Sequence, residues 1–195
     1  MTRKASVKRK TMETDVSLAL NLDGEGIAQI TTGIGFFDHM LTLWSKHGLF
    51  DVTLEVDGDL AVDGHHTVED TGIVLGQALL QALGDKTGIC RYGTAFVPMD
   101  EALVMVSLDI SGRPYLAFSA DLPVQNSGGF TSELAEEFFR ALAVHAGLTV
   151  HVQLLSGKNA HHCIEAMFKA LGRALRAAVQ KDDRISGVMS TKGLL

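Results

Sequence analysis

The spacing of apolar residues predicts strands and helices that follow one another along the whole chain. Apolar side chains at every second position indicate strands, whereas spacings of three and four indicate helices. The predicted strands are Ala5–Met12, Asp15–Leu22, Val52–Val56, Phe96–Met99, Leu103–Ile110, Tyr115–Ser119 and Leu148–Leu155. The predicted helices are Phe36–Lys46, Val68–Leu83, a helix from an N-cap at Ser132 to about Ala146, and Ala160–Val179.

A histidine motif occurs twice in this pattern. Residues His65–Glu69 and His161–Glu165 both read HHxxE, and each is followed after five residues by LGxAL, so seven of fifteen aligned positions are identical. The match extends upstream to Glu13 and Glu101, which are followed by apolar residues and a glycine at the same offsets. Core packing does not require repeated exposed histidines. The sequence therefore indicates a duplicated unit of about ninety residues.

The duplication sets the expected fold. A unit of this size buries too little apolar surface by itself, so we expect one domain over residues 1–195, built from the repeats 1–87 and 88–195. Each repeat combines strands with helices. We therefore predict an α+β fold with two sheets, each covered by helices on one face.

Composition narrows the classes of function. The net charge of -6 argues against nucleic acid as a partner, and no stretch of the 195 residues is long and apolar enough to span a membrane. The basic residues Arg3–Lys10 precede no apolar run, so we expect no signal peptide. Two cysteines, Cys90 and Cys163, do not make a disulfide framework, which fits a reducing, cytoplasmic setting.

The HHxxE motif has the chemistry of a metal site. Residues i and i+4 share one helix face, so His65 with Glu69, and His161 with Glu165, suit one ion each. Neighbouring residues point about 100° apart, so adjacent histidines are better suited to two different ions. Imidazole with carboxylate favours Mn, Fe, Co, Ni or Zn. One such motif alone is more often structural or a surface feature; two in matching register are not.

Further ligands are expected from the helix that precedes each motif. His39 stands before the first motif, and Glu136 and Glu137 stand before the second. The remaining histidines have no matching partner in the other repeat. We interpret His47, His145 and His151 as packed or surface residues. The alternative for His151, on a predicted strand near the second motif, is a hydrogen bond to one of the metal ligands.

Several longer motifs resemble the imidazoleglycerol-phosphate dehydratase family. They are GFFDHML (Gly35–Leu41), DGHHTVEDTGIVLG (Asp63–Gly76), PMDEAL (Pro98–Leu103), DISGRPYL (Asp109–Leu116), KNAHHCIEAMFKALGRALR (Lys158–Arg176) and STKG (Ser190–Gly193). The resemblance runs from about Arg9 to the C-terminus. It implies a fold of the ribosomal S5 domain 2-like type and a cage of 24 identical subunits, with sites shared between subunits and assembled when metal binds.

The resemblance also implies an activity: the dehydration of D-erythro-imidazole glycerol phosphate to imidazole acetol phosphate in histidine biosynthesis, with two Mn²⁺ ions per site. Metal on both ring nitrogens would favour an imidazolate that expels the hydroxyl group. Glu13 is the implied acid/base, and Glu69 or Glu165 is a possible second proton carrier. The implied metal ligands are His39, His65, His66, Glu69, His161, His162 and Glu165, with Glu137 where many members have histidine. The implied substrate contacts are Glu13, His39, Arg91, Arg113, Lys169, Ser190 and Lys192.

Two other classes of protein compete with this hypothesis. A non-catalytic metal-binding cage would need no phosphate-binding residues such as Arg91, Arg113 and Ser190. A dinuclear metal hydrolase would usually need bridging aspartates, which the paired motifs do not supply.

Overall fold

The computed structural model describes residues 3–195 and consists of two halves with the same order of main elements, the second half having two additional short strands. The first half contains β1 (Lys4–Lys10), β2 (Thr14–Asn21), β3 (Ala28–Thr31), α1 (Gly35–Gly48), β4 (Asp51–Gly58) and α2 (His65–Leu83). The second contains β5 (Tyr92–Met99), β6 (Ala102–Asp109), β7 (Tyr115–Ser119), β8 (Asn126–Ser127), β9 (Phe130–Thr131), α3 (Leu134–Ala146), β10 (Thr149–Ser156) and α4 (Ala160–Val179).

The two main sheets have one topology. Their strand orders are β1-β2-β4-β3 and β5-β6-β10-β7, and in each the outer strand β3 or β7 runs parallel to its neighbour. The hairpin registers also agree, because Lys10 pairs with Asp15 and Pro98 pairs with Leu103. Glu13 and Glu101 therefore stand at the same place in their hairpins. The α+β fold with a duplicated unit, predicted from the sequence, is confirmed.

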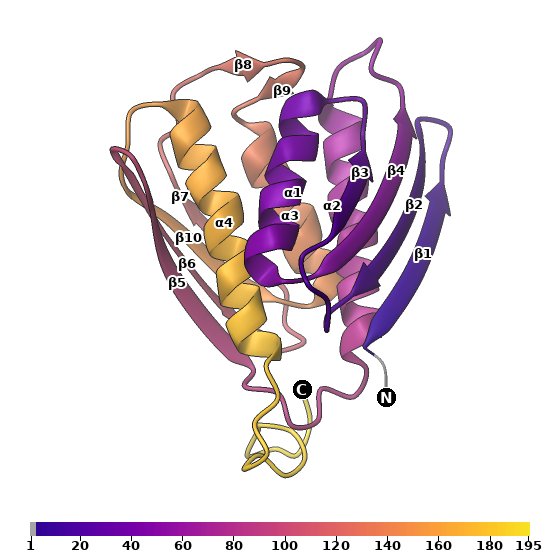
Figure 1. The fold of residues 1–195 in the computed structure, drawn as a ribbon, viewed down its shortest axis with the longest axis vertical. Helices are drawn as coiled ribbons and strands as arrows, with labels where there is room; N and C mark the ends of the chain where they lie inside the picture. Colours follow the sequence, from indigo (N-terminus) through magenta and orange to yellow (C-terminus); the bar gives the residue numbers. More distant parts are fainter. Residues whose placement is uncertain (1–2) are drawn as a thin grey trace.

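The helices fill the space between the two sheets (Figure 1). Helices α1 and α2 pack on the first sheet, α3 and α4 on the second, and the halves meet where α2 contacts α3 and α1 contacts α4. Glycines permit this approach: a Cβ atom at Gly72 would lie 2.8 Å from the Cβ of Ala141, and one at Gly172 would lie 2.5 Å from the carbonyl oxygen of Trp44. Each HHxxE helix thus packs against a helix of the other half.

One apolar core joins the halves. The rings of Phe138 on α3 and Phe168 on α4 stack with centroids 5.0 Å apart, and Phe37 on α1 meets both edge-on. All three side chains are fully buried. Within residues 3–195, none of the helices combines the length and the apolar composition that crossing a membrane requires.

Several local features differ from the sequence predictions, among them the short strands β8 and β9, which were not predicted. Strand β3 was not predicted, because four residues are too few to establish an alternation. Helix α2 begins at His65 instead of Val68, so the whole first motif is helical. Ser132 is not the N-cap of α3; that position is Glu133, and the Ser132 hydroxyl donates to the carbonyl oxygen of Pro123 instead.

Candidate functional site

Helix packing brings three predicted metal ligands together within this chain. His39 lies on α1, and His161 and Glu165 lie on α4, so the α1–α4 contact joins them. One ligand atom of each lies within 4.8 Å of the others. Glu165 Oε2 is 3.2 Å from His161 Nε2 and 3.5 Å from His39 Nε2. The carboxylate is buried, whereas both imidazoles are about half exposed, so the group opens to solvent on one side.

The carboxylate of Glu165 is held in its charged form. Burial opposes the charge, but Lys169 Nζ lies 2.6 Å from Oε1 and, together with His161, lowers the pKa of Glu165. Lys169 thus occupies one oxygen and leaves the other facing the two imidazoles. Two imidazoles and an ionised carboxylate oxygen within reach of one point are a suitable donor set for a divalent transition metal.

Adjacent histidines in each motif face different partners. The rings of His161 and His162 are 6.1 Å apart and nearly perpendicular, and those of His65 and His66 have the same relation. His162 Nδ1 donates to Glu101 Oε2 at 2.7 Å, while His161 faces Glu165. This separation is what the helix geometry predicts for neighbouring residues.

Carboxylates orient one histidine of each pair. His66 Nδ1 donates to Asp59 at 3.0 Å, as His162 does to Glu101, and each carboxylate raises the pKa of its histidine. Metal-binding histidines usually donate their second ring nitrogen to such a group. The pKa of Glu101 falls to about 2, because its hydrogen bonds with His162 and with two backbone amides favour the carboxylate.

The first motif is less complete within the chain. Glu13 Oε1 lies 3.8 Å from His66 Nε2, and its side chain is half exposed. Across residues 3–195, His65 and Glu69 form no ion pair within 4.0 Å, and the one ion pair of Glu137 is with Arg140 at 4.0 Å. The structure therefore does not bring His65, Glu69 and Glu137 into one group.

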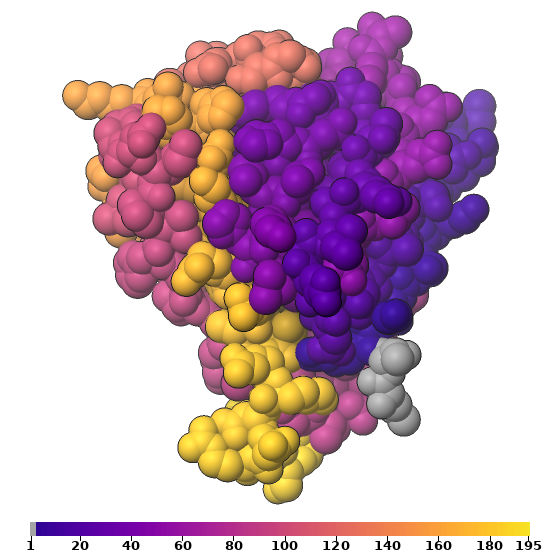
Figure 2. All heavy atoms as spheres, viewed as in Figure 1, coloured from indigo at the N-terminus to yellow at the C-terminus, as the bar shows by residue number. Residues whose placement is uncertain are grey.

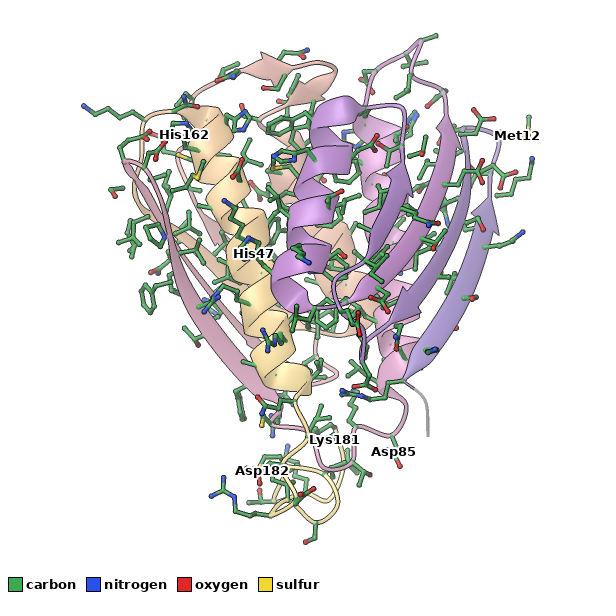
Figure 3. The ribbon with its side chains drawn as sticks, in the orientation of Figure 1. Met12, His47, Asp85, His162, Lys181 and Asp182 are labelled. Carbon is green, nitrogen blue, oxygen red and sulfur yellow. The ribbon has the colours of Figure 1, made fainter. Side chains whose placement is uncertain are left out.

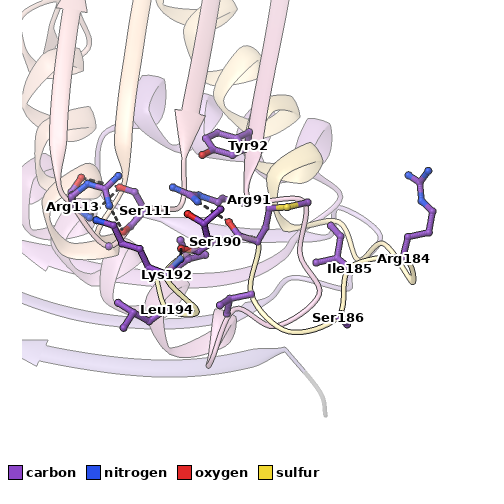
Figure 4. Close-up of a pocket in the computed structure, with 15 residues that line it drawn as sticks. Arg91, Tyr92, Ser111, Arg113, Arg184, Ile185, Ser186, Ser190, Lys192 and Leu194 are labelled. Carbon is purple, nitrogen blue, oxygen red and sulfur yellow. Dashed lines mark hydrogen bonds between the residues drawn. The ribbon is translucent and has the colours of Figure 1, made fainter.

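Four predicted phosphate contacts gather in a cleft of about 1030 Å³ (Figure 4). Arg91 precedes β5, Arg113 follows β6, and Ser190 and Lys192 come from the C-terminal segment. The two arginines lie far from the two C-terminal side chains in the sequence, yet all four line the same cavity. Lys169 does not line it and stays beside Glu165.

Asp109 organises this cleft and was missed in the sequence. Its carboxylate accepts two hydrogen bonds from Arg91, at 2.7 and 3.1 Å, and lies 3.9 Å from Arg113. The hydrogen bonds raise the pKa of Arg91. Asp59 was missed in the same way. Asp109 and Arg91 lie 18 residues apart and outside any helix, and Asp59 lies in the loop before α2, so helical or strand periodicity does not indicate either pair.

The metal motifs and the cleft lie at opposite ends of the molecule. The backbone amide of Arg91 donates to the carbonyl of Ala178 in the last turn of α4, whereas His161 lies in its first turn. At 1.5 Å per residue the helix separates them by about 25 Å. Figure 3 shows His162 and Met12, beside Glu13, at one end, and Asp182 at the other, where the C-terminal segment projects (Figure 2).

The remaining histidines lie apart from these groups. His145 is packed against the glycine face of α2 at Gly76. His151 is exposed on β10 beside Tyr115. Burial, with Lys169 and Arg173 nearby, lowers the pKa of His47. None of them joins the group formed by His39, His161 and Glu165.

The halves of common topology and the repeated motif helices define a duplicated α+β protein with an imidazole–carboxylate group at one end and a cationic cleft at the other. The family model for imidazoleglycerol-phosphate dehydratase matches residues 32–175, and the chain belongs to this family.

Relatives match over the whole chain. The imidazoleglycerol-phosphate dehydratase of Acetivibrio thermocellus is 64% identical over 195 residues, which is all of both chains. That of Clostridium botulinum strain Kyoto is 63% identical over 191 residues, covering 98% of this chain and 97% of the relative.

Solved structures share the fold. The Staphylococcus aureus imidazoleglycerol-phosphate dehydratase has a TM-score of 0.83 at 44% identity, covering 92% of this chain and 99% of the other. The IGPD of Pyrococcus furiosus, crystallised with (S)-C348, has a TM-score of 0.84 at 39% identity, covering 97% and 100%.

Proposed function

We propose that this chain dehydrates D-erythro-imidazole glycerol phosphate to imidazole acetol phosphate, as a Mn²⁺-dependent step of histidine biosynthesis. The family assignment supports the reaction. The observation that carries the proposal is the pairing of two kinds of site. Imidazole–carboxylate groups suit a metal that binds an azole ring, and an arginine-lined cleft suits a phosphate.

The metal ligands come from both motifs. His39, His161 and Glu165 have the donor set for one ion. We assign His65, His66, Glu69, Glu137 and His162 to the remaining positions. When bound, a divalent cation at a ring nitrogen stabilises negative charge on an imidazole and so favours loss of a proton.

The chain's own residues then move protons and hold the substrate. The carboxylate of Glu13 is exposed beside His66 and is free to take the proton from the substrate carbon; in its protonated form the same group would protonate the leaving hydroxyl. Glu69 and Glu165 are candidates for the other proton transfer. Arg91, Arg113, Ser190 and Lys192 hold the phosphate, and Lys169 and His39 contact the substrate near the metal.

A second subunit is needed for this arrangement. The motif end and the phosphate cleft of one chain are about 25 Å apart along α4, far more than a molecule with one ring, three carbons and a phosphate can span. Sites between subunits would bring the motif end of one chain to the cleft of another. This requirement supports the homo-oligomer, with 24 subunits as the proposed number.

Turnover of imidazole glycerol phosphate with and without Mn²⁺ tests the proposal. We expect the full chain to form imidazole acetol phosphate when Mn²⁺ is present, and to lose this activity after chelation. A metal-binding cage protein would bind Mn²⁺ tightly and assemble without any turnover, and that result would reject the proposed function.

A further inference from the structure

A buried carboxylate, paired with a partly exposed arginine, lies beneath the first hairpin. Asp70 follows Glu69 on α2 and lies one turn after His66, with only 6% of its surface exposed. Arg9 on β1 forms an ion pair with Asp70 Oδ2, and the hydroxyl of Thr14 on β2 donates to the same oxygen. Three elements of the first half therefore meet at one carboxylate.

The fold itself does not require these charges. Removing a charge from water is costly, and the Arg9 Nη1 contact is an ion pair without an aligned hydrogen bond. The equivalent positions in the second half hold Val97, Ala102 and Ala166, and all three are buried. The same packing is thus achieved there with apolar side chains, so the pair in the first half calls for another explanation.

The pair connects to Glu13 through the hairpin turn. The hydroxyl oxygen of Thr11 accepts hydrogen bonds from the backbone amides of Glu13 and Thr14, at 3.1 and 3.0 Å. The Thr11 and Thr14 hydroxyls lie 3.3 Å apart. The turn that carries Glu13 is therefore fastened to α2 through Thr11, Thr14 and Asp70.

The second hairpin is fastened differently. Glu101 Oε1 accepts the backbone amides of Lys158 and Asn159, at 3.1 and 2.8 Å, and Oε2 accepts from His162. Both oxygens of Glu101 are thus used as anchors at the start of α4. Glu13 accepts no side-chain hydrogen bond among residues 3–195, and its nearest cationic partner is His66 at 3.8 Å.

We propose that Asp70, with Arg9 and Thr14, is a positioning residue that holds Glu13 beside His66. In the second half the Glu101 carboxylate itself anchors the hairpin. In the first half Asp70 on α2 anchors it instead, which leaves the Glu13 carboxylate free. This inference rests on the proposed function, in which Glu13 transfers protons. Asp70 acts through the backbone of the turn and does not contact the substrate.

Variants of Thr14 and Asp70 test the anchor in the full chain loaded with Mn²⁺. Thr14→Val keeps the shape and removes the hydroxyl, and Asp70→Asn removes the charge. Each should lower kcat by about 10–100-fold, because displacing a catalytic group by about 1 Å lowers the rate by this order of magnitude. KM and bound Mn²⁺ should stay unchanged, and Thr14→Ser should restore kcat.

A matched control removes a buried hydrogen bond elsewhere. The Ser45 hydroxyl donates to the carbonyl of Phe50 at 2.7 Å, away from the motifs, so Ser45→Ala should destabilise the chain without lowering kcat. In metal-free protein, amide hydrogen exchange at residues 11–14 should be faster in Thr14→Val and unchanged in Ser45→Ala.

The decisive comparison repeats the Thr14→Val substitution in a chain that already carries Glu13→Gln. With the Glu13 carboxylate absent, adding Thr14→Val should cost little further rate in single-turnover measurements. Equal losses in both backgrounds, or an equal loss in Ser45→Ala, would overturn the inference. Should Asp70→Asn fail to fold, the Thr14 variants decide. If the unsubstituted chain does not turn over the substrate, the proposed function fails, and this inference fails with it.

Discussion

The two HHxxE helices share a sequence pattern but not a set of partners. In the second half, Glu165 and His161 meet His39 of α1 within the same chain. In the first half, α2 packs against α3, where Glu137 pairs with Arg140 instead. Duplication therefore preserved the helices and their packing, while the residues that contact each motif diverged.

The hairpin glutamates have diverged as well. Glu101 uses both carboxylate oxygens to hold the start of α4 and to orient His162, whereas Glu13 leaves its carboxylate exposed. Glu101 is a structural anchor, whereas the equivalent Glu13 has a free carboxylate. This difference supports the acid/base role proposed for Glu13, whose carboxylate oxygens are not used as anchors.

Removing one histidine from either motif should have the largest effect. His65→Ala and His161→Ala should each abolish turnover and the large assembly. Removing a residue that only orients a metal ligand lowers metal affinity or activity by ~10–100-fold, and removing the ligand itself should have a larger effect. Steady-state kinetics and light scattering measure both properties. His151→Ala, exposed on β10, is the control. Normal Mn²⁺-dependent activity in either motif variant would refute the duplicated site.

The glutamate pair should separate catalysis from anchoring. Glu13→Gln should lower kcat by ~10²–10⁴-fold, the usual contribution of a general acid or base, while substrate binding remains. Glu101→Gln should instead weaken Mn²⁺ binding by about 10–100-fold through His162 and keep most of kcat at saturating metal. Kinetics at several Mn²⁺ concentrations distinguish the two. A near-normal kcat for Glu13→Gln would remove Glu13 from the acid/base role.

Replacing Glu137 by histidine should change metal preference more than rate. Imidazole is a softer ligand than carboxylate, so Glu137→His should shift the preference from Mn²⁺ toward Co²⁺ or Zn²⁺, with kcat altered by only a few-fold. Competition between metals, followed by metal analysis, measures the shift. An unchanged preference would mean that Glu137 binds no metal.

The smallest effect should come from the first residue of β4. Asp51 Oδ1 accepts the backbone amides of Glu25 and Ile27, and these bonds lower its pKa. This contribution to stability is present above the ordinary aspartate pKa and is lost as pH falls below it. Asp51→Asn should lower the Tm of metal-free protein by about 2–4 °C at pH 7, and by less at pH 3.

Its counterpart provides the control. Thr149 begins β10 and donates its hydroxyl to the carbonyl of Arg113 at 2.9 Å. Threonine does not titrate, so the Tm difference between Thr149→Val and the unsubstituted chain should be the same at pH 7 and pH 3. A similar pH dependence in both variants would show that the effect of Asp51 is not electrostatic.

Periodicity, together with the repeated histidine motif, was enough to predict the duplicated fold. The apolar face of Phe37 and Trp44 and the long stripe of α4 give clear helical spacings, and the repeat set the order of elements. The short strand β3 was not predicted, because four residues are too few to show a period. The N-cap of α3 was predicted wrongly, because the Ser132 hydroxyl donates to the carbonyl of Pro123 and does not cap the helix.

The partners within each site could not be predicted from spacing. Asp109, at the end of β6, joins Arg91, just before β5, and Asp70 meets Arg9 and Thr14 only where α2 packs on the first sheet. Such contacts depend on which elements become neighbours. The motif letters gave the ligand types, whereas helix packing decided that His39 meets the second motif.

A titration that follows bound Mn²⁺ and turnover together tests the central claim most directly. Metal-free chain is given increasing Mn²⁺, and the metal bound per chain is measured beside the rate of imidazole acetol phosphate formation. The two motifs predict that turnover rises until two ions are bound per chain, with one ion giving little activity. Full turnover at one ion per chain, or without any, would contradict the account.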